Sequence, residues 1–229
     1  MRIITWNCNL SLGRKIDTLL ALNPDVAIIQ ECEREFTAPS GYSYLWCGQN
    51  VKKGLGVLSR DKDAFAAPDA SSDWTYFLPA TLPNLNLKIL AVWAYNHRAA
   101  KLGATRTGYP RNAISQLAPW LSSGRSIVAG DFNNWAGWDK PGNPNGMREV
   151  ATQLKALGLT SAYHGIRNEH LGQETTMTHY FQKNDAKGFH IDYCFLHESL
   201  KPLEIEIPQF QVWRKSSDHV PFLTVTSDA

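Results

Sequence analysis

Residues 126–133 read Ser-Ile-Val-Ala-Gly-Asp-Phe-Asn, a short apolar run with a carboxylate and an amide directly behind it. A continuous apolar run of this length is typical of a strand that is buried on both faces. Residues 25–31, Asp-Val-Ala-Ile-Ile-Gln-Glu, repeat the pattern. Both segments therefore predict buried strands that deliver a carboxylate, Asp131 or Glu31, to the edge of a sheet.

A third apolar run carries its charge inside. Residues 189–196, Phe-His-Ile-Asp-Tyr-Cys-Phe-Leu, place Asp192 among apolar neighbours. A buried carboxylate requires a hydrogen-bonding partner, so we expect Asp192 to be held by another polar group. A fourth acid, Asp218, precedes the last apolar run of the chain.

Each of the other three acids also has a purely structural interpretation. Glu31 can cap the turn at residues 33–35, Asp131 can begin an Asx-turn, and Asp218 can pair with Lys215. These alternatives stay open for each residue taken alone.

Strand patterns outnumber helical ones along the chain, and helices interrupt the strands. This arrangement favours an α+β fold in which two packed, mainly antiparallel sheets carry helices on their outer faces. The length fits a single domain over residues 1–229. We expect strands at 2–8, 25–30, 42–46, 56–60, 74–82, 85–95, 126–130, 189–196, 203–212 and 220–226, and helices at 16–22, 110–121 and 147–157.

The overall composition excludes several classes of protein. With 23 Lys and Arg against 21 Asp and Glu, the net charge is +2, so whole-chain charge predicts no partner. A hydrophobic content of 43% supports a folded core, and no window reaches the roughly 18 apolar residues of a membrane span. The first residues lack a signal-peptide pattern, and the cysteines lack CxxC spacing. We therefore expect a monomeric cytoplasmic protein with reduced thiols and no membrane partner.

Six short motifs occur in order along almost the whole chain. They are Thr5-Trp6-Asn7, Ile29-Gln30-Glu31, Gly54-Leu55-Gly56-Val57-Leu58-Ser59, Gly130-Asp131-Phe132-Asn133, Ile191-Asp192-Tyr193 and Ser217-Asp218-His219. Each motif alone is weak evidence, but six in the right order and spacing are strong. Together they resemble the endonuclease/exonuclease/phosphatase superfamily with its DNase I-like fold, and they are similar to the motifs of exonuclease III and abasic endonucleases. The resemblance implies a four-layer α/β/β/α sandwich.

The resemblance also implies a metal site. Hydrolysis of a phosphodiester requires that the phosphate charge be shielded, that a water be aimed in line, and that the developing charge be stabilised. Mg²⁺, with Mn²⁺ as the alternative, prefers oxygen ligands, which suits carboxylates and an amide. Glu31 is the implied main ligand, with Asn7 beside it and Asp218 near the same ion.

Four further residues receive implied roles in catalysis. Asp131 would act as the general base or orient the water, with Asn133 on the same side of an extended segment. His219 would donate to a phosphate oxygen, and Asp192 would fix its ring and favour the imidazolium. A surface histidine is the alternative interpretation of His219.

Two aromatic positions are less certain within the same resemblance. Tyr95 closes a predicted strand much as a phosphate-contacting tyrosine does in abasic endonucleases, and His97 is a rival for this role. Simple packing at a strand edge is the alternative for Tyr95. Many members carry arginine before the Ile-Asp-Tyr motif, where this chain has His190, so a phosphate contact there would be weaker or pH-dependent.

The region 74–130 contains no Asp or Glu, and its cations are densest in a Gly-containing segment that follows Tyr95. A cationic loop beside a metal site favours polyanionic substrates and makes binding salt-dependent. A solvated loop without a ligand is the alternative. The residues expected to bind substrate are His97, Arg98, Lys101, Arg106 and Arg111.

Two further pairs of side chains are candidates for substrate contact. Trp135 and Trp138 can stack on bases, or they can pack in the core. Lys52 and Lys53 can contact phosphates, or they can form a solvated turn.

Taken together, the sequence predicts a divalent-metal-dependent phosphodiesterase, most simply an endonuclease or exonuclease acting on DNA or RNA. One alternative is a phosphatase of inositol phosphates or other phosphomonoesters. It is disfavoured because the Cys-Asp-Arg-type signature of inositol phosphatases is absent around Asp192. An amphipathic lipid-binding stretch is absent as well. The other alternative is an inactive nucleic-acid-binding module, which would have no need for converging carboxylates.

Overall fold

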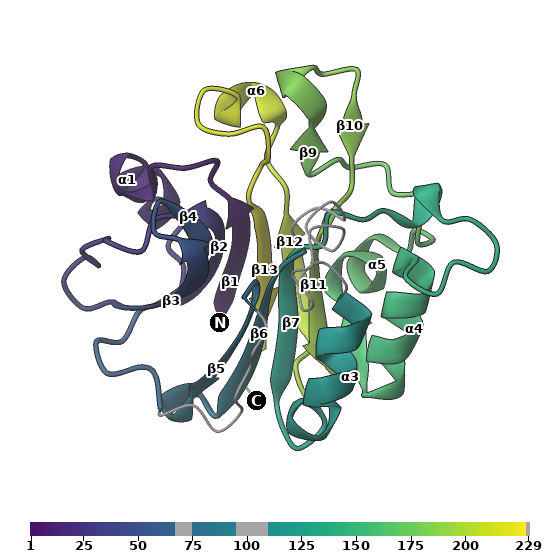
Figure 1. The fold of residues 1–229 in the computed structure, drawn as a ribbon, viewed down its shortest axis with the longest axis horizontal. Helices are drawn as coiled ribbons and strands as arrows, with labels where there is room; N and C mark the ends of the chain where they lie inside the picture. The colour runs from purple at the N-terminus through teal and green to yellow at the C-terminus, as the bar shows by residue number, and fades with distance from the viewer. Residues whose placement is uncertain (67–74, 95–109, 228–229) are drawn as a thin grey trace.

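The computed structural model describes residues 1–66, 75–94 and 110–227, in which two sheets pack face to face (Figure 1). The first sheet has the strand order β12-β13-β1-β2-β4-β3, and the second has the order β5-β6-β7-β11-β8. The strands of the first sheet are β1 (Arg2–Asn7), β2 (Val26–Cys32), β3 (Ser43–Asn50), β4 (Lys53–Ser59), β12 (Pro202–Glu206) and β13 (Phe222–Thr226). Those of the second are β5 (Phe77–Leu82), β6 (Leu87–Trp93), β7 (Ser126–Asp131), β8 (Leu159–Ser161) and β11 (Asp192–His197). A separate hairpin consists of β9 (His179–Tyr180) and β10 (Gly188–Phe189).

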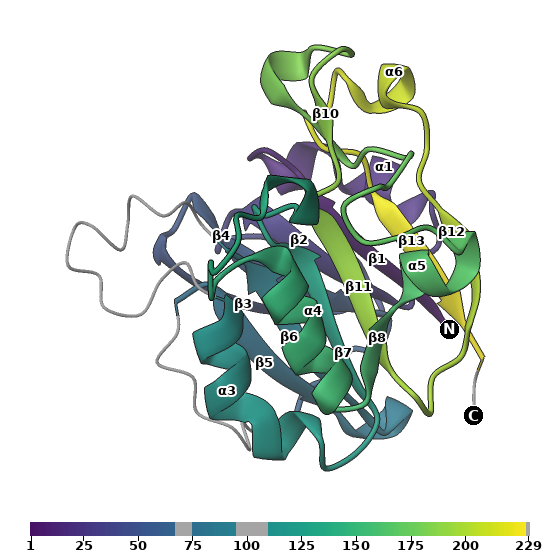
Figure 2. The same ribbon diagram turned by 90° about the vertical axis from the view of Figure 1, so that its right-hand side faces the viewer.

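Helices cover the outer faces of both sheets and complete four layers (Figure 2). The expected α/β/β/α sandwich is therefore confirmed. Among the described residues, no helix has both the length and the apolar character that a bilayer crossing demands. Helices α3 (Pro110–Leu121) and α4 (Met147–Ala156) lie on the second sheet, whereas α1 (Ile16–Leu20) and α6 (Phe210–Trp213) lie on the first. The remaining helical segments are α5 (Ala162–Arg167), η1 (Leu12–Arg14), η2 (Pro83–Leu85), η3 (Ala136–Trp138) and η4 (Phe181–Lys183).

The apolar core between the sheets fixes how their ends line up. Ile28 and Val57 of the first sheet and Ile89 and Ala129 of the second are fully buried in one cluster. Burying each large aliphatic side chain contributes roughly 1.5–3 kcal/mol, so sliding one sheet over the other would be costly. The two sheet ends therefore form a firm support for polar groups.

Strand pairing brings the ends of five strands to one end of the sandwich. β1 is parallel to β2, with Asn7 opposite Gln30, and β6 is parallel to β7, with Trp93 opposite Asp131. Carboxyl ends of parallel strands meet at the same edge. β11 is antiparallel to β7 and starts there, with Asp192 opposite Asp131. Strand register thus pairs Asp131 with Asp192 at the end of the second sheet, and it carries Asn7 and Gln30, the residue before Glu31, to the end of the first.

The expected strand over residues 203–212 is wrong in its second half. β12 ends at Glu206, and a short helix, α6, begins at Phe210. Pro208 lies between them and cannot donate to a strand ladder. Phe210 and Trp213, three residues apart, are both buried on the helix side that faces the sheet.

The apolar run 189–196 is also divided. β10 ends at Phe189 and β11 begins at Asp192. Between them, the backbone N–H groups of Ile191 and Asp192 both donate to Thr178 Oγ1, at 3.1 Å each. Asp192 is therefore the first residue of its strand, at the sheet end, and not an interior position.

Candidate active site

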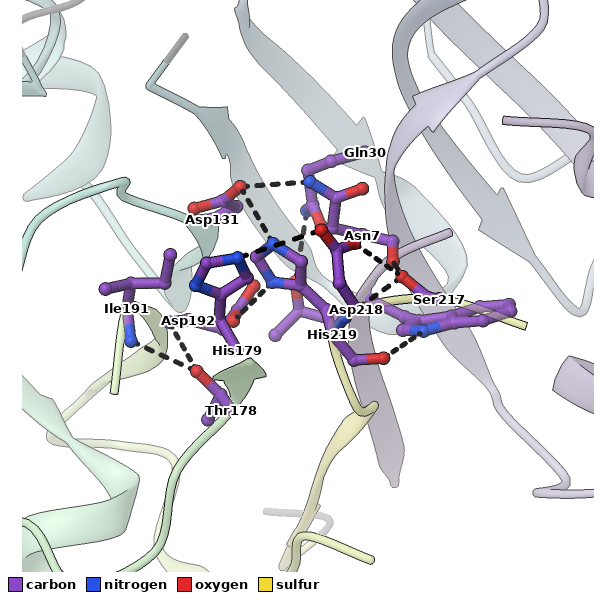
Figure 3. A network of polar contacts seen from close by, with 12 residues as sticks. Asn7, Gln30, Asp131, Thr178, His179, Ile191, Asp192, Ser217, Asp218 and His219 are labelled. Carbon is purple, nitrogen blue, oxygen red and sulfur yellow. Dashed lines mark hydrogen bonds and ion pairs between the residues drawn. The ribbon is translucent and has the colours of Figure 1, made fainter. Parts of the chain in front are cut away.

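A polar cavity of about 220 Å³ opens at the end of the sandwich where β1, β2, β6 and β7 terminate. Both sheets contribute to its wall, and Figure 3 shows the polar network around it. Its lining residues are Asn7, Asn9, Glu31, Trp93, Asp131, Asn133, His179, Asp218 and His219.

Asp131, the last residue of β7, is only 1% exposed and accepts three hydrogen bonds. Asn133 donates through its backbone N–H (2.8 Å) and its side-chain amide (3.1 Å), and Asn7 donates through Nδ2 (3.1 Å). The first of these bonds is the Asx-turn, so that structural role coexists with a place in the cavity. Burial raises the pKa of the Asp131 carboxyl to about 7, against the opposing effect of the His219 charge. A carboxyl with such a pKa suits proton transfer near neutrality.

Gly130 lets the strand before Asp131 approach its neighbour closely. Its φ angle is +147°, and a Cβ at this position would lie 1.8 Å from the carbonyl oxygen of Val92 on β6. Only glycine tolerates that contact, which explains this residue in the motif that delivers Asp131.

His219 lies between two carboxylates. Its Nδ1 is 2.9 Å from Asp192 Oδ2, and its Nε2 is 3.9 Å from Asp131 Oδ2. Burial alone lowers the pKa of the ring, but the charge of Asp192 and the hydrogen bond to it, aided by Asp131, raise it to about 10. The ring is therefore an imidazolium at neutral pH, with Nε2 on the side of Asp131.

Backbone and hydroxyl contacts hold Asp192 and His219 in place (Figure 3). Thr178 Oγ1 accepts the backbone N–H of Asp192 at 3.1 Å. Ser217 Oγ accepts the backbone N–H of His219 at 3.0 Å and donates to the carbonyl of Asn7 at 2.7 Å. The carboxylate and the imidazole are thus fixed from separate segments, which predefines their geometry.

Glu31 faces the cavity from a β-bulge. The register between β2 and β4 shifts between Gln30 and Cys32, and Glu31 has the left-handed φ of 60°. Bulges of this kind re-aim a side chain away from the regular alternation of a strand. Lys53, at the start of β4, approaches Glu31 with Nζ 3.1 Å from Oε2.

Asn9 links Asn7 and Asp218, which line the same cavity as Glu31. Its backbone N–H donates to Asn7 Oδ1 at 3.1 Å, and its side-chain amide donates to Asp218 Oδ1 at 3.2 Å. His179 Nε2 lies 3.8 Å from Asp218 Oδ2. Burial opposes ionisation of Asp218, but contact with His179 and the charge of His219 hold its pKa well below the usual range. Asp218 is therefore a carboxylate.

The oxygen atoms of Glu31, Asn7 and Asp218 fit a hard divalent cation. A second group, Asp131, Asp192 and His219, also brings its ligand atoms within 4.8 Å of one another. The charged ring of His219 has no lone pair to offer, and it already pairs with both acids. The first group is therefore the one whose chemistry suits a metal.

Of the basic residues expected to bind substrate in the segment after Tyr95, only Arg111 belongs to the described part of the chain. Arg111 lies at the start of α3, and its Nη1 donates to the carbonyl of Pro144 at 2.6 Å. It does not line the cavity. The other positions fall outside the described residues: Tyr95, His97, Arg98, Lys101 and Arg106.

The two tryptophans after β7 differ in what they contact. Trp135 is half-buried, and its Nε1 donates to Glu174 at 2.6 Å. Burial alone would raise the pKa of Glu174, but hydrogen bonds with His164 and Trp135 hold it at about 2. Trp138 is 45% exposed, and its ring lies 4.9 Å from that of Phe189. Trp135 thus anchors the loop, whereas Trp138 presents a surface.

Three residues that line the cavity were not predicted from the sequence. Trp93 could have been expected, because it ends a strand that runs parallel to β7. Asn9 could have been expected as well, because it lies two residues after Asn7, a predicted metal ligand. His179 gave no sequence signal, because an isolated bridge to His219 brings it in, with ring centroids 4.4 Å apart. His190, for which a phosphate contact was weighed, is fully buried with Nδ1 2.7 Å from the carbonyl of Thr176.

Carboxylates, amides and an imidazolium that converge at the end of two packed sheets suit the hydrolysis of phosphate esters above other chemistries. The protein is accordingly a phosphoester hydrolase by class. Residues 4–219 match the model of the Endonuclease/Exonuclease/phosphatase family, and the chain belongs to that family. No curated protein sequence matches the chain.

Solved structures share the fold along nearly the whole chain. One is a 3′ phosphatase, NExo, from Neisseria bound to product DNA hairpin, with 21% identity, a TM-score of 0.71, and 99% of each chain covered. The same protein is also described as a 3′-5′ exonuclease from Neisseria meningitidis. Another is an AP endonuclease from Archaeoglobus fulgidus, with 17% identity, a TM-score of 0.73, and 99% of each chain covered. At these identities the likeness establishes the fold.

Proposed function

We propose that this protein is a divalent-metal-dependent phosphodiesterase that cleaves nucleic acid by in-line attack of water. The observation that carries the proposal is the meeting, in one cavity, of the buried Asp131 with the charged His219–Asp192 pair. Asp131 would then act as the base, and His219 as a hydrogen-bond donor to the same phosphate group.

Glu31, Asn7 and Asp218 would hold the cation, Mg²⁺ first and Mn²⁺ as the alternative. When bound, the cation neutralises phosphate charge and stabilises the leaving oxygen. Asn9 supports this set, because it hydrogen-bonds both Asn7 and Asp218.

Asp131 would orient the water and accept its proton, with the amide of Asn133 beside the same carboxylate. His219 would donate from Nε2 to a non-bridging phosphate oxygen as charge develops. Asp192 keeps the proton on Nδ1 and stabilises the charged ring. The hydrogen bonds of Asn133 with Asp131 and of His219 with Asp192 are already in place, so these side chains need little reorganisation during the reaction.

Features beside the cavity support a nucleic-acid substrate. The β9–β10 hairpin stands beyond the sheet ends, next to α6 (Figures 1 and 2). At its tip, Phe181 is 48% exposed, and Lys187 Nζ lies 5.8 Å from the centre of that ring. Trp138, whose ring contacts that of Phe189 on β10, is exposed as well. Aromatic faces and lysines suit the bases and phosphates of a nucleic acid. Arg98, Lys101 and Arg106, which lie outside the described residues, would add positive charge for the same substrate.

DNA is the polymer that we place first, because the similar solved proteins are described as a 3′ phosphatase with a DNA hairpin and as an AP endonuclease. The first of these descriptions also supports a second candidate, the removal of a 3′-terminal phosphate from DNA. Both reactions use the same attack by water on phosphorus.

An activity panel tests the proposal. Purified protein is incubated with Mg²⁺ or Mn²⁺ and with duplex, abasic duplex, single-stranded and 3′-phosphorylated DNA, with RNA, and with inositol phosphates. We expect cleavage of at least one DNA substrate, its loss in EDTA, and its loss in Asp131→Asn. The matched control is Asp17→Asn, which removes an exposed acid of α1 and should keep full activity. Turnover of inositol phosphates alone, or full activity of Asp131→Asn, would overturn the proposal.

A further inference from the structure

Lys53 occupies an unusual place for a lysine in a site that suits a divalent cation. It is the first residue of β4, and its Nζ lies 3.1 Å from Glu31 Oε2. The β-bulge that turns Glu31 into the cavity lies opposite the start of this strand, where Cys32 pairs with Gly54. The ammonium group is therefore aimed at the carboxylate by strand register.

Each acidic side chain of the cavity faces a basic one. Asp192 and Asp131 face His219, and Asp218 faces His179 at 3.8 Å. Glu31 faces Lys53. Converging carboxylates repel one another, so these contacts lower the electrostatic cost of the metal-free protein.

Lys53 is more exposed to solvent than the two histidines are. The His219 side chain is 6% exposed and that of His179 is 14% exposed, whereas that of Lys53 is 32% exposed. Lysine has a flexible four-carbon stem, and an ion pair that is partly exposed to water is weak. Its Nζ also lies 5.5 Å from the centre of the Trp93 ring, which lines the same cavity and offers a second resting place for the cation.

We propose that Lys53 is a displaceable counter-ion of Glu31, which neutralises this carboxylate before loading and competes with the divalent cation for it. The inference rests on the proposed function, since it takes Glu31 to be a metal ligand. Lys53 is on this account a positioning residue that lowers the affinity of the site for its cation. Loading of the site then depends on cation concentration, because an internal positive charge must first be displaced.

Direct cation binding tests this without substrate. Mn²⁺ is titrated into metal-free protein and followed by electron paramagnetic resonance, with thermal melting in EDTA to show that each variant is folded. We expect Lys53→Met to bind Mn²⁺ roughly tenfold more tightly than the wild type, because the competing charge is gone. Lys53→Arg, which keeps the charge, should stay within about threefold of the wild type.

Lys52→Met is the matched control, because it removes the same charge from the exposed neighbouring position. We expect its Mn²⁺ affinity to match that of the wild type. Equal or weaker affinity in Lys53→Met, or equal gains in both methionine variants, would overturn the role of Lys53. If no variant binds Mn²⁺ while nucleic acid is still cleaved in EDTA, the proposed metal dependence fails instead, so the two failures are distinguishable.

Discussion

The two sheets present their acids to the cavity in different states. On the first sheet and the segment before β13, the side chains of Glu31 and Asp218 are 17% and 29% exposed. On the second sheet, Asp131 and Asp192 are 1% and 0% exposed. Partly exposed carboxylates can exchange one partner for another, whereas fully buried ones keep the partners that the fold gives them. The first group is therefore suited to binding a cation and the second to moving a proton.

The largest loss of activity should come from a substitution at His219, which contacts the two buried acids Asp131 and Asp192. His219→Ala removes the imidazolium that faces Asp131 and leaves Asp192 buried without its partner. We expect kcat/KM on the best DNA substrate to fall by about 10³-fold or more, because a preorganised donor is lost. Affinity for DNA, measured by fluorescence anisotropy in Ca²⁺, should change by less than about fivefold.

His197→Ala is the control for that substitution. His197 closes β11 at its other end, where its ring contacts Ser199, away from the cavity. Its activity should match the wild type. A residual activity of His219→Ala above about a tenth of the wild type would show that the buried pair is structural.

A substitution of Glu31, in the partly exposed group, should reduce the rate in a way that depends on Mg²⁺. Glu31→Gln keeps the shape of the side chain but removes the charge that suits a divalent cation. We expect about a 10²-fold loss of rate at low Mg²⁺ and substantial recovery when Mg²⁺ is raised. Steady-state rates measured across a Mg²⁺ titration check this. A loss that no Mg²⁺ concentration reverses would place Glu31 with the catalytic group and erase the contrast.

The dependence of stability on pH separates the two sides in the metal-free protein. The pKa of His219 is raised to about 10 in the folded state, chiefly because Asp192 overcomes the effect of burial. A raised histidine pKa gives stability that is fully present below the unfolded value near 6.5 and is lost as pH rises toward 10. Asp192→Asn removes this contribution, and we expect its free energy of unfolding at pH 7 to be lower by roughly 2–4 kcal/mol.

The difference between the wild type and Asp192→Asn should therefore shrink from pH 7 to pH 10. Urea unfolding in EDTA at a series of pH values measures it. The comparison cancels groups common to both proteins, such as the buried thiol of Cys194, whose pKa burial raises to about 12. A difference that does not change with pH would mean that Asp192 does not set the charge of His219.

Glu31, Asp131 and Asp218 were predictable from the sequence because each lies close to one end of an apolar run, and Asp192 because a charge inside such a run is unusual. Strand register then carries Glu31 and Asp131 to one end of the sandwich, as the local pattern indicates. Contacts between segments that are distant in the sequence were not predictable. His179 reaches the cavity through a bridge to His219, and no local pattern marks it. Lys53 was weighed only as a phosphate contact or a solvated turn, since its partner depends on a bulge in another strand.

The fold shows the same division. Apolar runs located most strands, but the segment after β12 was misassigned because β propensity was weighted above Pro208 and the i, i+3 spacing of Phe210 and Trp213. Local pattern thus fixes which segments are strands, while turns and partners depend on packing.

The smallest expected effect concerns the surface beside the buried group. Trp138→Ala removes an exposed ring that follows β7, and stacking of a base on an aromatic ring contributes roughly 1–3 kcal/mol. Because solvent already covers much of this ring, we expect the low end, about a fivefold weaker affinity for single-stranded DNA by fluorescence anisotropy. Mn²⁺ affinity should not change, since Trp138 does not line the cavity.

Trp135→Phe gives the internal contrast. Trp135 donates to the buried Glu174, and phenylalanine cannot replace that donor. This variant should lose thermal stability and keep its DNA affinity, the reverse of Trp138→Ala. If both variants weaken DNA binding equally, the loop acts as one stacking surface and burial does not separate the two rings. If Trp138→Ala leaves DNA affinity unchanged, the substrate does not stack on this ring, and Phe181, which follows β9, is the exposed ring to be replaced next.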